Sequence, residues 1–89
     1  FIQEELKEEL SILRDKVESL EVIFDLPRLK EEIERIKKDL TSEELWSSPQ
    51  RARELLKRKS RLEDIVSHFE SLSDKLNYLE KSIGILEEE

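Results

Sequence analysis

The side chains that could carry acid–base or nucleophilic chemistry are few in this sequence, and His68 is its only histidine. Asp64 precedes it by about one helical turn and Ser71 follows it by about one turn. These are the residue types of a catalytic triad, but all three would lie along one exposed face of a helix, which cannot enclose a substrate. We therefore expect His68 to be a solvated surface side chain.

Metal and cofactor sites lack their usual ligands. The absence of cysteine excludes disulfides and thiolate metal sites. The 23 acidic residues include none of the Glu-x-x-His pairs that build di-iron centres in helical bundles. With Gly84 as the only glycine, no glycine-rich loop can hold a phosphate. The sequence predicts a protein that is not an enzyme, with no catalytic residue, metal, cofactor or small-molecule substrate.

Charge is the more informative signal, because it changes sign along the chain. The formal net charge is −7. Residues 1–27 hold three basic and eight acidic side chains, net −5, and residues 62–89 hold two basic and eight acidic, net −6. Residues 28–61 hold eleven basic and seven acidic side chains, net +4. A net negative charge argues against the whole chain lying on nucleic acid. Any basic surface of this chain that binds a partner should therefore be confined to one segment.

The positive charge is concentrated in six cations within eleven residues, which wrap the helix and are opposed only by Glu54. They are Arg51, Arg53, Lys57, Arg58, Lys59 and Arg61. One interpretation is a solvated helix start with ion pairs to the preceding helix. The other is a docking tip for RNA or an acidic protein, near Lys37 and Lys38. The residues we select as candidate contacts to a partner are Arg51, Lys57, Arg58 and Arg61.

Two helices should precede this basic segment. Apolar residues recur at steps of four and three, the heptad pattern of a helix that packs on another helix. The first series is Leu6, Leu10, Leu13, Val17, Leu20 and Phe24; the second is Leu26, Leu29, Ile33, Ile36 and Leu40. Pro27 separates them, since proline disfavours helix in the residue before it and suits a first turn. We expect helices at about 2–24 and 26–40.

A polar connection follows, in which Thr41 with Glu44 and Ser47 with Gln50 have the spacing of capping boxes. Trp46, the only tryptophan, is expected to be a hydrophobic plug that closes the bend between two helices.

The third helix, at about 48–88, carries two heptad series. One is Leu55, Leu62, Phe69, Leu76 and Ile83; the other is Ile65, Leu72, Leu79 and Leu86. Arg58 takes a position in this seam where an apolar residue is expected, so packing should loosen near the helix start.

We therefore predict an all-α protein, a single helical domain over 1–89, built as a long antiparallel coiled-coil-like helical hairpin or a three-helix bundle. At 1.5 Å per residue the third helix spans ~60 Å and the first two ~36 and ~22 Å. The matching lengths favour the first two helices lying end to end along the third. Folding the first helix back would give the bundle instead.

The chain shows no sign of a membrane partner. No segment approaches the ~20 apolar residues of a membrane span, and no signal-peptide pattern opens the sequence, so we expect a cytoplasmic protein. The sequence begins at Phe1 and ends at Glu89 without a cap, which suggests the N-terminal fragment of a longer protein.

The order of these features resembles the N-terminal helical domain of bacterial peptide chain release factor two, a class I release factor. The run Ile23-Phe24-Asp25-Leu26-Pro27 leads into a helix rich in Glu, Arg and Leu. A polar turn ending in Leu45-Trp46 follows, and Pro49 and Ala52 open the next helix. The similarity runs from Phe24 to about Leu62. Ser47 stands where the family usually has asparagine, which keeps the capping role.

The resemblance implies a role in translation termination at UAA and UGA codons. It implies that this segment contacts the ribosome, through ribosomal RNA and the proteins of the stalk base, and orients the factor. The Gly-Gly-Gln loop that promotes peptide release in the family is absent from this sequence, so no functional residue is carried over.

A second hypothesis remains open on the residues alone. The heptads would equally suit a structural coiled coil or scaffold unrelated to translation, whose partner is another helix. Self-association through a second copy of the chain belongs to the same hypothesis.

Overall fold

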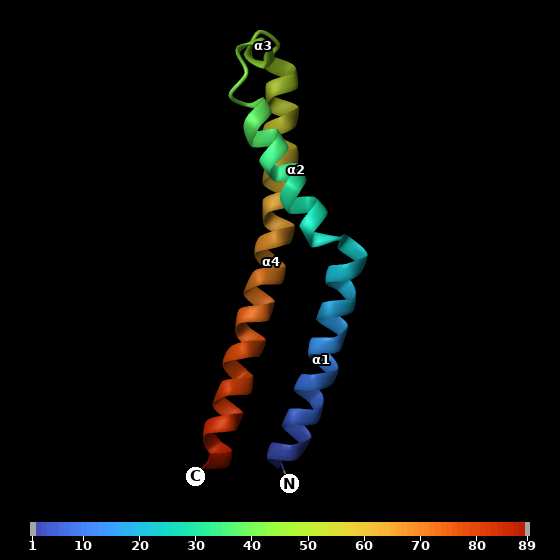
Figure 1. Ribbon diagram of the computed structural model, residues 1–89, viewed down its shortest axis with the longest axis vertical. Coiled ribbons are helices and arrows are strands. Elements are labelled where there is room, and N and C mark those ends of the chain that lie inside the picture. The colour runs from blue at the N-terminus through green and yellow to red at the C-terminus, as the bar shows by residue number, and fades with distance from the viewer. Residues whose placement is uncertain (1, 89) are drawn as a thin grey trace. The chain divides into compact units, whose positions relative to one another are not determined.

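The computed structural model describes residues 2–88 as four α-helices joined by short turns (Figure 1). They are α1 (Ile2–Phe24), α2 (Leu26–Asp39), α3 (Glu43–Trp46) and α4 (Pro49–Glu88). Residues 2–88 contain no strand, so the all-α, coiled-coil-like fold class is confirmed.

The helices pack in two compact units. Unit 1 is formed by residues 1–23 and 68–89, and unit 2 by residues 24–67. In unit 1, α1 pairs with the later part of α4, and in unit 2, α2 pairs with the earlier part of α4. Each unit has its own buried residues and its own polar contacts.

The core of unit 2 comes from the apolar stripes of α2 and α4. Ile33, Ile36, Leu62 and Val66 are buried together, and Leu26, Leu29, Leu40 and Leu55 pack around them. These α2 residues recur at steps of three and four, which places them on one side of the helix. Ala52 lies only 1% exposed near the start of α4, where a small side chain allows close approach.

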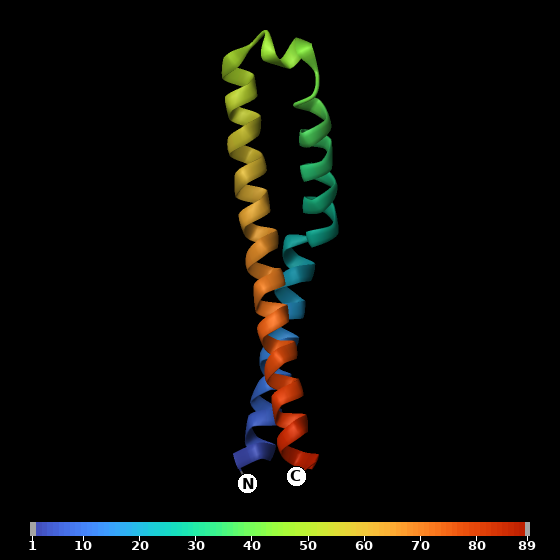
Figure 2. The same cartoon turned by 90° about the vertical axis from the view of Figure 1, so that its left-hand side faces the viewer.

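The connection between α2 and α4 is held by hydrogen bonds to helix ends rather than by the predicted capping boxes. The Thr41 hydroxyl donates to the Lys38 carbonyl at 2.6 Å, and the Ser47 hydroxyl donates to the Glu44 carbonyl. The capping-box prediction is therefore wrong: both hydroxyls satisfy carbonyls at the end of the preceding helix. Figure 2 shows α3 between the end of α2 and the start of α4.

Trp46 is not the buried plug that the sequence suggested, because 53% of it is exposed. Its indole Nε1–H donates to the Leu40 carbonyl at 2.7 Å. The ring thus joins the end of α3 to the end of α2 by one hydrogen bond. A tryptophan that is partly exposed to solvent commonly makes such a bond through its N–H.

The break between α1 and α2 is made by Asp25, whose backbone is left-handed, with a φ of 51° and a ψ of 65°. Pro27 follows in the first turn of α2, and the Leu29 N–H donates to the Asp25 carbonyl at 3.1 Å. Aspartate is among the few non-glycine residues that enter this region with any frequency. The sequence predicted a first helix ending near Phe24 and a second starting near Leu26, but spacing alone does not reveal the left-handed residue between them.

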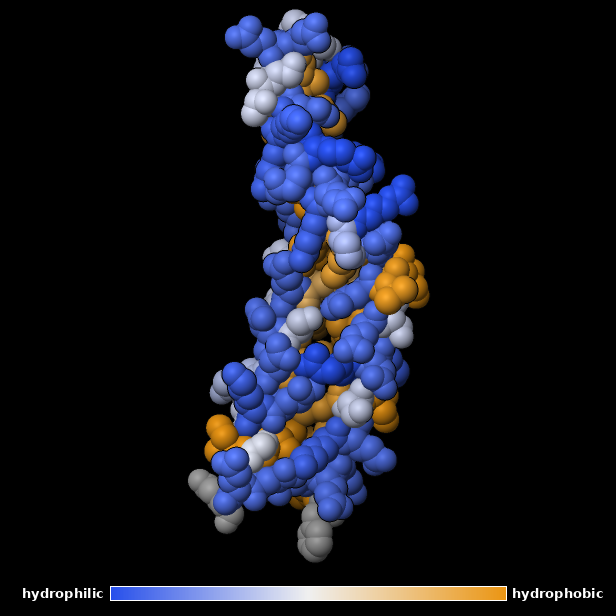
Figure 3. All heavy atoms as spheres, in the orientation of Figure 1, coloured by the Kyte–Doolittle hydropathy of each residue, from blue (hydrophilic) through white to orange (hydrophobic). Residues whose placement is uncertain are grey.

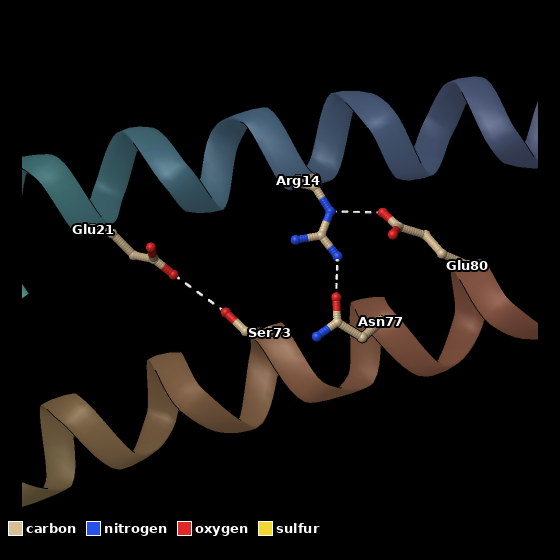
Figure 4. Close-up of polar contacts among 5 residues, drawn as sticks. All are labelled: Arg14, Glu21, Ser73, Asn77 and Glu80. Atoms are coloured by element: carbon tan, nitrogen blue, oxygen red, sulfur yellow. Dashed lines mark hydrogen bonds and ion pairs between the residues drawn. The ribbon is translucent and has the colours of Figure 1, made fainter.

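Unit 1 is held by an antiparallel apolar seam with polar contacts beside it. Val17 of α1 is buried, as are Phe69, Leu76 and Ile83 of α4. Arg14 donates to Glu80 at 2.6 Å and to Asn77 at 2.7 Å, and Ser73 donates to Glu21 at 3.3 Å (Figure 4). Lys7 pairs with Glu87 farther along. Figure 3 shows hydrophilic side chains covering these helices on the face it views, with apolar side chains in the groove between them.

Candidate partner-binding surface

The start of α4 positions the candidate contact residues. The Ala52 N–H donates to the Ser48 carbonyl at 3.2 Å, and the helix then runs without interruption through the basic segment. At 3.6 residues per turn, all four candidates fall within about a third of the helix circumference. They are Arg51, Lys57, Arg58 and Arg61, and all are exposed. Arg53 lies one turn before Lys57, about 40° beyond this sector, so it borders the candidates.

Arg58 is bound to α2. Its Nε and Nη2 both lie 2.5 Å from the Glu32 carboxylate. The hydrogen bond from Arg58 has the largest effect and lowers the pKa of Glu32. Burial opposes it, and the charges of Arg58, Arg35 and Arg28 each lower the pKa by a smaller amount. The same hydrogen bond raises the pKa of Arg58. This is the ion pair to the preceding helix that the first interpretation of the basic segment anticipated.

The surroundings of Glu32 reveal two cations that the sequence analysis missed. Arg28 and Arg35 lie four residues before and three residues after Glu32, so all three share one side of α2. Both act on the Glu32 carboxylate, which Arg58 also contacts. The sequence could have indicated them, because their spacing of four and three residues from Glu32 places all three side chains on one side of a helix.

We define the basic face as the six cations that gather on this side of unit 2. They are Arg28 and Arg35 of α2 with Arg51, Lys57, Arg58 and Arg61 of α4. The Arg58–Glu32 pair sets the antiparallel register, which brings Arg61 level with the first turn of α2, where Arg28 lies. Four carboxylates share the face by the same spacing, those of Glu31, Glu32, Asp39 and Glu54, with Asp64 at its edge. The surface is therefore mixed but net positive.

Three candidates differ from Arg58 in having no partner within the described residues. The side chains of Arg51, Lys57 and Arg61 make no hydrogen bond or ion pair in the span 2–88. Their charges are available to a phosphate or carboxylate group of a partner.

Lys37, which was expected beside the candidate residues, and Lys59 of the basic segment take a different position. Lys37 contacts Glu34 at 3.3 Å, and Lys59 contacts Glu63 at 2.8 Å. The pKa of Glu63 is lowered chiefly by its hydrogen bond with Lys59. Burial opposes this, and the charges of Lys59 and Lys37 each lower the pKa by a smaller amount. Lys37 and Lys59 therefore belong to the opposite flank of the α2–α4 pair, where carboxylates balance them.

A hollow of about 270 Å³ adjoins one end of the basic face. It is lined by Asp39, Ser42, Glu44, Leu45, Ser48, Arg51 and Leu55. Its carboxylates and single arginine match no catalytic arrangement, and His68 is exposed on α4, outside it. Among residues 2–88, no group of three or more His, Asp or Glu side chains could hold a metal ion. No helix in that span is long and apolar enough to cross a membrane.

Comparison with known proteins assigns the chain to a family. The family model of the PCRF domain matches residues 29–89. Peptide chain release factor 2 of Chloroflexus aggregans is 33% identical over 85 residues, covering 96% of this chain and 23% of that protein. The same factor from Thermomicrobium roseum is 35% identical over 65 residues, covering 73% and 17%. That of Petrotoga mobilis is 24% identical over 89 residues, covering 100% and 24%.

The chain thus spans about a quarter or less of the length of these relatives. No solved structure matches it significantly.

Proposed function

Because this chain belongs to the PCRF domain family, we propose that it is the ribosome-contacting N-terminal segment of a codon-specific release factor that terminates translation at UAA and UGA. The observation that carries the proposal is the family match over residues 29–89, together with relatives named peptide chain release factor 2. The resemblance between Phe24 and Leu62 supports the same assignment. The proposed place of action is the cytoplasm, where ribosomes translate.

In this proposal the basic face contacts ribosomal RNA, and neighbouring parts of the chain contact proteins of the stalk base. Arginine and lysine bind phosphates, and helix-borne cations hold a fixed spacing along an RNA backbone. Arg51, Lys57 and Arg61 are the best placed, since none makes an ion pair within residues 2–88. Arg58 serves in part to join α4 to α2 through Glu32.

The segment positions the factor and does not catalyse release. The sequence holds one glycine and no Gly-Gly-Gln run. Among the residues that line the hollow beside Arg51, no hydrogen bond joins a hydroxyl to a carboxylate, so they form no nucleophile–base pair. Catalysis in this proposal belongs to other parts of the whole factor.

Ribosome affinity of charge-reversed variants tests the proposal. Lys57→Glu/Arg61→Glu should weaken binding of the chain to purified ribosomes by about tenfold or more in 0.1 M salt, because two phosphate contacts become repulsive. Arg58 is left unchanged so that the pair with Glu32 survives. The matched control is Lys75→Glu/Lys81→Glu, which changes the net charge equally at exposed positions of α4 outside the basic face.

Salt gives a second readout on the same samples. With roughly two to three phosphate contacts, the slope of log affinity against log salt should be about −1.5 to −2.5, and the Lys57→Glu/Arg61→Glu variant should lose part of it. Equal affinities for the variant and its control would contradict the assignment of the basic face. Helicity measured by circular dichroism should stay the same in both, since lysine, arginine and glutamate are all good helix formers.

A further inference from the structure

Unit 1 has two different flanks, and its polar contacts reveal the register. Lys7 faces Glu87, Arg14 faces Glu80 and Glu21 approaches Ser73. Each step of seven residues along α1 is matched by a step of seven back along α4. The polar side chains therefore follow one flank of the antiparallel pair for its whole length, as Figure 4 shows for the inner two levels.

The same register brings leucines together on the other flank. Leu6, Leu13 and Leu20 lie one position before Lys7, Arg14 and Glu21, which turns them about 100° back around α1. On α4, Leu86, Leu79 and Leu72 lie one position before the partners of those residues, Glu87, Glu80 and Ser73. In an antiparallel pair these two equivalent rotations point to the same side. We call the six residues the leucine flank; its three levels are Leu6 with Leu86, Leu13 with Leu79, and Leu20 with Leu72.

The leucine flank is not covered within the described chain. Its members are between 42% and 53% exposed, whereas Val17 and Leu76 in the seam beside it are buried. Ile2 and Ile23 border it on α1, at 75% and 76% exposed. Together these eight side chains expose on the order of 800 Å², about what each partner contributes to a standard-size protein interface. Monomers rarely leave so large an apolar patch in water.

Charge is arranged so that the leucine flank can meet a copy of itself. Residues 1–23 and 68–89 hold thirteen acidic and five basic side chains, but few of them border the leucines. The charged residues that flank it closely are Glu9 and Lys16 on α1 and Lys75 on α4, by their helical positions. Both signs are present at the flank, and most of the acidic residues lie on other sides of the two helices.

We propose that the leucine flank binds the leucine flank of a second copy, in an antiparallel face-to-face dimer. The flank is self-complementary about its middle level, because Leu13 and Leu79 lie there with leucines one heptad away on either side. A two-fold axis through that level places Leu6 over Leu20 of the other copy. It also brings Lys16, three residues after Leu13, level with Glu9, four residues before Leu13. A parallel arrangement, with the two-fold axis along the helices, would stack α1 on α4 of the other copy and bring Lys16 close to the level of Lys75, two like charges.

Sedimentation equilibrium of the chain tests this inference. We expect a reversible monomer–dimer equilibrium that tightens as salt rises, since salt screens the repulsion between two chains of net charge −7. Leu13→Gln/Leu79→Gln should raise the dimer Kd by about tenfold or more, equal to about 1.4 kcal/mol or more. The control is Val22→Gln, which removes an apolar side chain that is 79% exposed and lies away from the leucine flank; it should leave the Kd unchanged.

Charge swapping tests the antiparallel arrangement. Glu9→Lys and Lys16→Glu should each weaken the dimer, because two like charges then face each other across the interface. The double variant should restore the affinity, because a lysine at position 9 then faces a glutamate at position 16 of the other copy. Circular dichroism confirms that each variant keeps its helices.

Three results would overturn the inference: a helical chain that stays monomeric at all concentrations, a dimer indifferent to Leu13→Gln/Leu79→Gln, or a double charge swap that fails to restore affinity. The inference is independent of the proposed function. Salt strengthens this dimer and weakens ribosome binding, so the two can fail separately.

Discussion

At the scale of single residues, the contact between Arg58 and Glu32 joins α4 to α2 and lowers the pKa of the Glu32 carboxyl group. Arg58 lowers the pKa of Glu32 from its ordinary 4.5 by hydrogen bonding. A carboxyl with a lowered pKa in the folded state binds its proton less readily there than in the unfolded chain. The stabilisation is therefore complete above the unfolded pKa and is lost as the pH falls through the lowered folded pKa.

Glu32→Gln should remove this pH dependence. The free energy of unfolding of the variant should fall below that of the parent chain at pH 7, and the difference should shrink as the pH drops below about 4.5. Urea unfolding at several pH values measures it. The control Glu31→Gln removes a neighbouring exposed carboxylate on α2. A difference for Glu32→Gln that persists unchanged in strong acid would show that the ion pair is not its source.

Asp25 is the second residue with a specific local role, because its left-handed backbone separates α1 from α2. Asp25→Val should cost about 1–2 kcal/mol, the penalty for a β-branched side chain in this conformation. Asp25→Gly should be neutral or slightly stabilising, since glycine takes positive φ freely but loses more entropy on folding. Thermal unfolding measures both. If valine were tolerated as well as glycine, the backbone at this break could not be left-handed.

At the scale of helices, the buried stripe of α2 holds unit 2 together. Ile33 is 6% exposed among Ile36, Leu62 and Val66. Ile33→Asp should destabilise the protein by several kcal/mol, because it places an unpaired carboxylate in an apolar seam. The control Leu56→Asp, at a half-exposed leucine of α4, should cost about 1 kcal/mol or less. Equal melting temperatures for the parent chain and Ile33→Asp would contradict the α2–α4 seam.

The helices themselves were predictable because heptad spacing and two prolines mark them directly. The ends of α1, α2 and α4 follow from Pro27, Leu40 and Pro49, which sequence patterns locate well. The hydroxyls of Thr41 and Ser47 were assigned to the wrong helix ends, since residue spacing does not tell whether a side chain caps the helix before it or after it.

The candidate surface was predictable only in part. The basic run from Arg51 to Arg61 is evident in the sequence, but its division between two flanks depends on how α4 meets α2. Arg28 and Arg35 were missed because their relation to Arg58 runs through Glu32, on a different helix. Contacts between helices need a register, which composition and spacing alone do not supply.

At the scale of the whole molecule, the chain should bind without catalysing. We expect the purified 89 residues to release no peptide from peptidyl-tRNA, with or without a ribosome carrying a stop codon, because no Gly-Gly-Gln loop is present. A release assay measures this, with an intact peptide chain release factor 2 as the positive control. Stop-codon-dependent release by the chain alone would overturn the division between a positioning segment and a catalytic part.

The central claim, that this chain is the ribosome-contacting segment of a release factor, is tested most directly by competition. Labelled intact peptide chain release factor 2 is bound to ribosomes halted at UAA or UGA, and the 89-residue chain is added in increasing amounts. The account predicts that the chain displaces the intact factor, that Lys57→Glu/Arg61→Glu displaces it at least about tenfold less well, and that Lys75→Glu/Lys81→Glu matches the parent chain. A folded chain that leaves the intact factor fully bound at every concentration would contradict it.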